Sequence, residues 1–207
     1  ILTGAEDADP NGVGDPRDAV DSDWNGTADY LAAAAGASSG VVFAETKISA
    51  TSGGLTGPIT TVDHFGRATK AIGDLDGDGV VDMAVGADQD SDGGTLRGAV
   101  WILFMNTDGT VKAEQKISDT QGGLAATLSD GAFFGRSVAP IGDLDGDGQV
   151  DIVVGAPANN VLGAATGTAH VLFLNSDGTV KAEQTISGNE GGFGGVLDVA
   201  DNFGSAV

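Results

Sequence analysis

The segment Asp74-Leu75-Asp76-Gly77-Asp78-Gly79-Val80-Val81-Asp82 returns 69 residues later as Asp143-Leu144-Asp145-Gly146-Asp147-Gly148-Gln149-Val150-Asp151. Each copy places carboxylates at positions 1, 3, 5 and 9, with glycines between them. Four like charges in so short a segment repel one another unless a cation lies among them. Hard carboxylate oxygens at this spacing, with glycines that let the backbone turn inward, are typical of Ca²⁺ sites. The sequence therefore predicts two bound Ca²⁺ ions.

The residues that follow each acidic loop indicate a β-strand and not a helix. They are Met83-Ala84-Val85-Gly86-Ala87 and Ile152-Val153-Val154-Gly155-Ala156, short apolar runs rich in β-branched residues. An EF-hand would need a bidentate Glu at loop position 12 and a helix on each side, and valine stands there in both copies. Each loop is therefore expected to join one strand to the next.

The repetition extends well beyond the loops. Residues 65–133 align with residues 134–202 without a gap. Phe65-Gly66-Arg67 recurs as Phe134-Gly135-Arg136, and Phe203-Gly204-Ser205 begins a third copy. Self-similarity at a fixed period is the signature of a solenoid, a propeller or a tandem array.

One repeat predicts four antiparallel strands. The first three are Phe134 to Ile141, Ile152 to Ala156 and Thr168 to Leu174. In the other repeat the counterpart of the third strand, Ala99 to Met105, is apolar on both faces, as in a strand buried between sheets. The fourth, Val111 to Ser118, alternates apolar residues with lysines expected on a solvated outer face. Four strands running from a buried to an edge position describe a propeller blade, so we expect an all-β fold.

The order of these motifs resembles the FG-GAP repeat of integrin α-subunit β-propellers: Phe-Gly, then Asp-x-Asp-x-Asp-Gly-x-x-Asp, Val-Gly-Ala and Gly-Thr-Ala (Gly167-Thr168-Ala169). The resemblance implies Ca²⁺ held in the loop between the first two strands of each blade. It also implies the ligands, which are the side chains of Asp74, Asp76, Asp78 and Asp82 with the carbonyl of Val80, and the side chains of Asp143, Asp145, Asp147 and Asp151 with the carbonyl of Gln149.

The alignment divides the chain into about three blades. Residues 1–64 form a partial, irregular blade with an acidic insertion, 65–133 and 134–202 are blades with a Ca²⁺ loop, and 203–207 begin a further first strand. Either the chain is a window on a longer array, or subunits assemble head to tail and complete one another's blades. The ligand-like spacing in Asp21–Asp29 leaves open a further ion site there.

Composition restricts the partners and the setting. A formal charge of −21 excludes nucleic-acid binding as a default, since phosphate contacts need a basic surface. No run is long and apolar enough for membrane insertion. The absence of cysteine is compatible with a bacterial extracellular protein, and weak Ca²⁺ sites suit the millimolar Ca²⁺ outside cells. We therefore expect an extracellular or cell-surface location.

No catalytic residues are predicted. His64 and His170 are far apart in sequence, and His170 takes the third-strand position that Trp101 fills in the other copy, which indicates packing. A Gly-x-Ser-x-Gly nucleophile motif is absent. Arg67 and Arg136, which follow Phe-Gly, are expected to pair with nearby carboxylates. Trp24, in the acidic insertion, is the better candidate for an exposed aromatic.

The sequence thus favours a non-catalytic, calcium-binding extracellular repeat protein for adhesion or fibre assembly, in which Ca²⁺ rigidifies each blade. Its expected partners are copies of itself or further blades, and a glycan or protein ligand is a further possibility. Two alternatives stay open, a lectin-like carbohydrate-binding propeller and an accessory domain of a larger secreted enzyme, because propellers host many functions.

Overall fold

The core of the first repeat is a pair of apolar strands that lie side by side. Strand β2 (Asp82–Ala87) pairs antiparallel with β3 (Ala99–Met105), and every residue of β3 is buried, as its two apolar faces predicted. Strand β1 (Phe65–Gly73) pairs with β2, and β4 (Val111–Ile117) pairs with β3. The sheet order is therefore β1-β2-β3-β4, with each strand next to its neighbour in sequence.

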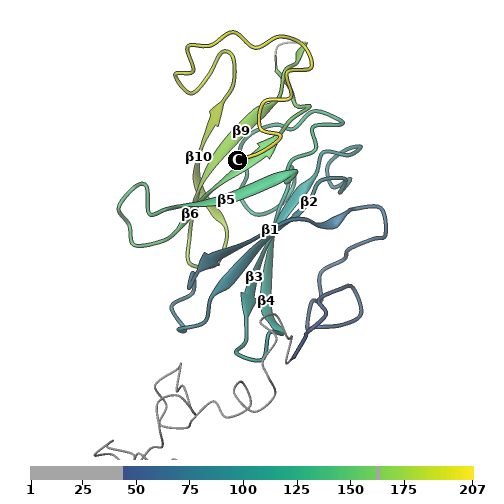
Figure 1. Cartoon of the computed structure of the whole chain (residues 1–207), viewed down its shortest axis with the longest axis vertical. Helices are drawn as coiled ribbons and strands as arrows, with labels where there is room; N and C mark the ends of the chain where they lie inside the picture. The colour runs from purple at the N-terminus through teal and green to yellow at the C-terminus, as the bar shows by residue number, and fades with distance from the viewer. Residues whose placement is uncertain (1–43, 162–163) are drawn as a thin grey trace, which may run out of the picture. The chain divides into compact units, whose positions relative to one another are not determined.

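The second repeat builds the same sheet again (Figure 1). Its strands are β5 (Ser137–Gly142), β6 (Asp151–Ala156), β9 (Thr168–Leu174) and β10 (Val180–Ile186), in the order β5-β6-β9-β10. A short hairpin, β7 (Asn160–Val161) and β8 (Ala164–Ala165), lies between β6 and β9 in the chain. This computed structural model describes residues 44–161 and 164–207, which contain no helix, and it confirms the all-β, blade-like fold class.

Two details of the predicted strands were wrong. β5 begins at Ser137 and not at Phe134, because Phe134 turns to the preceding repeat and donates its N–H to the carbonyl of Arg97 (2.9 Å). The fourth strand does not keep all its lysines in solvent. Lys116 is buried, and its ammonium lies 2.9 Å from a carboxylate oxygen of Asp90.

The two repeats meet through backbone atoms at the Phe-Gly motif. A Cβ on Gly86 of β2 would collide with the carbonyl oxygen of Gly135 in the second repeat, so only glycine permits this approach. Gly155 and Gly204 repeat the arrangement, and Phe203 donates its N–H to the carbonyl of Thr166 (3.0 Å). The third Phe-Gly copy therefore docks on the second repeat as the second copy docks on the first.

An apolar cluster closes the joint between the repeats. Ile72 and Leu75 of the first repeat are 2% and 1% exposed and pack in one cluster with Phe134 and Ile152 of the second. Their counterparts in the second repeat, Ile141 and Leu144, are 39% and 60% exposed. The burial of these positions therefore depends on a following repeat and not on the repeat that carries them.

A buried carboxylate also crosses the joint. Asp88 is fully buried and receives Arg136 from the second repeat at 2.9 Å, while Arg67 and His64 of the first repeat approach to 3.4 Å. The expected pairing of both arginines with a nearby carboxylate is thus present. A buried carboxylate needs such partners, because losing one leaves an uncompensated charge.

The predictions for the N-terminal segment fall almost wholly outside the described residues. These are the irregular blade assigned to 1–64, the acidic segment Asp21–Asp29 and the exposure of Trp24. Within the described part of the chain, no helix reaches the length and hydropathy that crossing a bilayer requires.

Gly86→Ala is expected to lower the free energy of unfolding by about 3 kcal/mol, because its methyl group meets backbone that cannot rotate away. Chemical denaturation measures the change. The control is Gly194→Ala, at a glycine with open space around it, which should change stability by less than about 0.5 kcal/mol. Equal effects of the two substitutions would contradict the proposed contact.

Candidate metal centres

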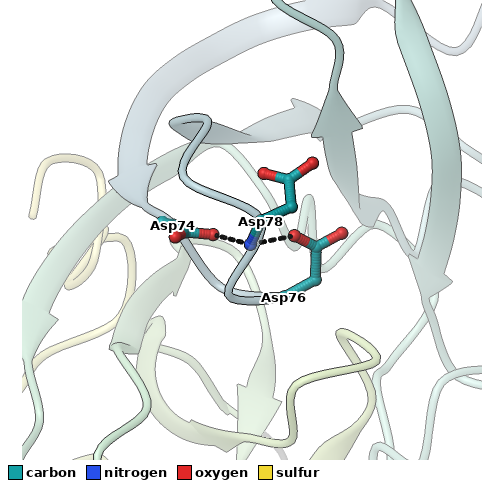
Figure 2. Close-up of side chains that lie close together, drawn as sticks. All are labelled: Asp74, Asp76 and Asp78. Carbon is teal, nitrogen blue, oxygen red and sulfur yellow. Dashed lines mark hydrogen bonds between the residues drawn. The ribbon is translucent and has the colours of Figure 1, made fainter.

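The first acidic loop is organised by its own backbone. Asp74, at position 1, accepts the N–H groups of Gly77 (2.8 Å) and Asp78 (3.0 Å) on one carboxylate oxygen and that of Gly79 (2.8 Å) on the other. Figure 2 shows the Asp78 nitrogen between the carboxylates of Asp74 and Asp76, which it contacts at 3.0 and 3.3 Å. The glycines adopt positive φ, which lets the chain turn inward around Asp74.

The carboxylate at position 9 fixes the loop to the sheet. Asp82 is fully buried at the start of β2, where it accepts the N–H of Leu75 (2.9 Å) and, across the sheet, that of Met105 (3.0 Å). Asp151 does the same in the second repeat, with Leu144 (2.8 Å) and Leu174 (3.2 Å). Position 9 therefore holds the loop in register with the third strand of its own sheet.

The second loop reproduces the first in detail. Asp143 accepts the N–H groups of Gly146 (2.7 Å), Asp147 (3.0 Å) and Gly148 (2.9 Å). Carboxylate oxygens converge to within 4.8 Å of one another in both loops, from Asp74, Asp76 and Asp78 in the first and from Asp143, Asp145 and Asp151 in the second. Asp147 lies beside them and accepts the N–H of Gln149 (2.8 Å).

Sequence reasoning missed one participant in each loop. Lys112, on β4, places its ammonium 2.6 Å from Asp76 and also contacts Asp78. Lys181, on β10, lies 2.7 Å from Asp145 and also contacts Asp147. Hydrogen bonding to these lysines lowers the pKa of Asp78 and of Asp147 and raises the pKa of both lysines. The sequence feature that could have indicated this contact is the lysine that follows Asp-Gly-Thr-Val in both copies.

The donor set of each loop fits a hard divalent cation. Clustered carboxylates supply anionic oxygen, and a cation already lies on positions 3 and 5 in the form of a lysine ammonium. The charge and ligand type therefore suit Ca²⁺. The side-chain ligands at positions 1, 3, 5 and 9 and the carbonyls of Val80 and Gln149 stay predictions.

The two histidines do not form a joint site. His170 is fully buried and packs edge-on against Phe134 at 5.6 Å between ring centroids, as Trp101 packs against Phe65 at 6.4 Å. His64 is exposed and lies at the ion cluster around Asp88. The packing role expected for His170 matches its place in the structure.

Asp82→Ala is expected to destabilise the protein by about 3 kcal/mol even in excess EGTA, because it leaves two buried N–H groups without acceptors. Asp76→Ala, on the exposed side of the same loop, should cost less than about 1 kcal/mol under those conditions. Urea denaturation in EGTA compares the two variants. A larger loss for Asp76→Ala would show that position 9 does not anchor the loop.

Comparison with known proteins agrees with this geometry. The FG-GAP repeat family matches residues 70–103 and 134–172, which include both acidic loops. Integrin alpha-PS5 of Drosophila melanogaster is 36% identical over 121 residues, covering 58% of this chain and 11% of the relative. Integrin alpha-5 of Xenopus laevis is 40% identical over 93 residues, covering 45% and 8%.

Integrin alpha-2 of Mus musculus is 36% identical over 105 residues, covering 49% of this chain and 8% of the relative. The chain thus spans about a tenth of the length of these curated relatives. The repeats, the two blade-like sheets and the paired acidic loops lead to one assignment. The chain contains two FG-GAP repeats, at residues 70–103 and 134–172, and is similar to integrin α subunits.

Proposed function

We propose that this chain is a non-catalytic, calcium-binding extracellular module that serves adhesion, with Ca²⁺ stabilising each repeat. The observation that carries the proposal is the convergence of three carboxylates within 4.8 Å in each of two equivalent loops. The similarity to integrin α subunits supports the adhesion role and the extracellular or cell-surface location. Two loops of the same design in successive repeats favour a structural role for the ion over a catalytic one.

The ion would be held by the side chains at positions 1, 3, 5 and 9 of each loop and by the carbonyls of Val80 and Gln149. Bound Ca²⁺ supplies the positive charge that lets these carboxylates stay together. The chain's own contribution is orientation. Backbone N–H groups hold Asp74 and Asp143 in place, and the buried Asp82 and Asp151 tie the loop to the sheet. Little reorganisation of the loop backbone is then needed on binding.

Lys112 and Lys181 give each loop an internal counter-ion. An ammonium between two carboxylates reduces their repulsion when no metal ion is present, and Ca²⁺ must displace it. These lysines therefore weaken Ca²⁺ binding and limit the loss of stability when Ca²⁺ is removed. Such tuning suits a module that works where Ca²⁺ is near millimolar.

Removal of Ca²⁺ with EGTA is expected to lower the melting temperature by on the order of 10 °C, since each site binds only the folded chain. Asp145→Ala should lose about half of this shift, because one of two sites is removed. Lys181→Met should enlarge the shift, because it removes the internal counter-ion. Differential scanning calorimetry with and without Ca²⁺ measures all three. An unchanged melting temperature in EGTA would end the proposed structural role of calcium.

We propose further that repeats add serially through the joint seen here, with 65–133 and 134–202 as the repeating units. The Phe203-Gly204 segment docks on the second repeat, and the exposed Ile141 and Leu144 are the apolar surface that a following repeat would cover. That repeat belongs either to the same chain or to another copy in a head-to-tail assembly. If the following repeat belongs to another copy, the head-to-tail assembly is a structural fibre.

If copies associate head to tail, Leu144→Asp is expected to abolish the assembly, because it places a charge in the apolar joint. Leu144→Met, which keeps an apolar side chain, should retain it. Negative-stain electron microscopy of both variants and the unaltered chain, with Ca²⁺ and with EGTA, shows the particle length. Single short particles from the unaltered chain in Ca²⁺ would refute self-assembly.

A further inference from the structure

The leucine at position 2 has a different environment in each acidic loop. Leu75, in the first loop, is 1% exposed and belongs to the apolar cluster at the joint, together with Phe134 and Val138 of the second repeat. Leu144, at the same position of the second loop, is 60% exposed. The repeat that follows the first loop therefore covers its position 2, and the corresponding side chain of the second loop lies in solvent.

Position 2 is closely connected to the carboxylates of its loop. In the first loop it separates Asp74 from Asp76, which are the proposed ligands at positions 1 and 3. The N–H of Leu75 also donates to the buried carboxylate of Asp82 at position 9 (2.9 Å). One residue is thus linked to three of the four carboxylate positions. A side chain fixed at this residue restricts the backbone that carries the ligands.

The isoleucine on the other side of position 1 shows the same contrast. Ile72, two residues before Asp74, is 2% exposed and packs in the same cluster at the joint. Its counterpart in the second repeat, Ile141, is 39% exposed. The second loop keeps its hydrogen bond from Leu174 to Asp151 (3.2 Å), which ties it to its own sheet. The first loop is therefore held by two repeats and the second by one.

The two loops nevertheless offer the same donor groups. Both carry carboxylates at positions 1, 3, 5 and 9, and both have a lysine counter-ion, with Lys112 2.6 Å from Asp76 and Lys181 2.7 Å from Asp145. The carboxylates that converge within 4.8 Å are those at positions 1, 3 and 5 in the first loop and at positions 1, 3 and 9 in the second. The loops therefore share their ligand chemistry and differ in how the backbone is held.

We propose that Leu75 is a positioning residue for Ca²⁺, and that ion binding in an acidic loop is coupled to the docking of the following repeat. The inference rests on the Ca²⁺ sites proposed above. A loop that is already ordered by a buried side chain loses less conformational freedom on binding, so its affinity is higher. The first loop therefore binds Ca²⁺ more tightly than the second. Because coupling between two binding events is reciprocal, Ca²⁺ in the first loop also strengthens the joint.

The first test compares the two loops in the unaltered chain. The full chain, labelled with ¹⁵N, is titrated with calcium chloride. The amide signals of Gly77 and Gly79 report on the first loop, and those of Gly146 and Gly148 report on the second. We expect the dissociation constant of the first loop to be about tenfold lower, within the range of typical coupling between sites. This comparison does not depend on the folding of any variant.

Substitutions at position 2 test the role of the leucine itself. Leu75→Ala should weaken Ca²⁺ binding at the first loop about tenfold and leave the second loop unchanged. Leu144→Ala, the matched substitution at the exposed position, should change neither loop. Leu75→Met keeps a large apolar side chain and should retain most of the affinity. A role in stability alone predicts no change of affinity at the first loop in any of these variants.

Two further experiments test the coupling from the joint. Val138→Ala removes methyl groups from the second repeat's side of the cluster and should weaken Ca²⁺ binding at the first loop only. In the reciprocal experiment, hydrogen exchange of the Phe134 amide, which donates to the carbonyl of Arg97 across the joint, should slow about tenfold with Ca²⁺. Asp76→Asn should abolish this slowing, and Asp145→Asn, the matched substitution in the second loop, should retain it.

The outcomes separate this inference from the proposed Ca²⁺ sites. Equal affinities at the two loops, or a first-loop affinity that neither Leu75→Ala nor Val138→Ala changes, would overturn the coupling and leave the Ca²⁺ sites in place. Loss of the slowed exchange in Asp145→Asn, with no loss in Asp76→Asn, would also overturn it. Titration signals that move in neither loop would overturn the Ca²⁺ sites and the coupling together.

Discussion

The architecture depends on a contact between backbone atoms of successive repeats. Gly86 on β2 faces Gly135, and Gly155 on β6 faces Gly204, at distances that no side chain permits. This close approach brings Phe134 into the apolar cluster of the joint and aligns its N–H with the carbonyl of Arg97. The glycine of Val-Gly-Ala and the glycine of Phe-Gly are therefore required as a pair, because a side chain on either one would prevent the contact between their backbones.

The carboxylates of each acidic loop have two different roles. Asp82 and Asp151 are fully buried and bond backbone N–H groups on both sides, so they hold the loop on the sheet. Exposed Asp76 and Asp145 face a lysine from the fourth strand. Removal of a buried anchor leaves unpaired donors, whereas removal of an exposed carboxylate changes mainly the local charge. This division allows ion binding to vary while the loop shape stays the same.

The two repeats carry different side chains at equivalent positions of the same four-stranded sheet. The backbone at Trp101 and His170 is equivalent, and both rings lie edge-on to the phenylalanine of the Phe-Gly motif. The change from Trp and Lys to His and Thr leaves the four-stranded sheet with the same strand order in both repeats. A repeat protein can thus change the side chains on one sheet while the contact between its repeats is kept.

The sequence by itself determined the period of 69 residues, the four-strand unit, the buried character of Ala99–Met105 and the two acidic loops. Local patterns suffice for these because strand periodicity and glycine placement are properties of short segments. Only the tertiary structure showed that Lys116 is buried and that Lys112 reaches the first loop, since both depend on side chains from distant segments. A cavity lined by Ala125, His170 and Glu183 likewise combines a connector with strands β9 and β10, so no local sequence pattern predicts it.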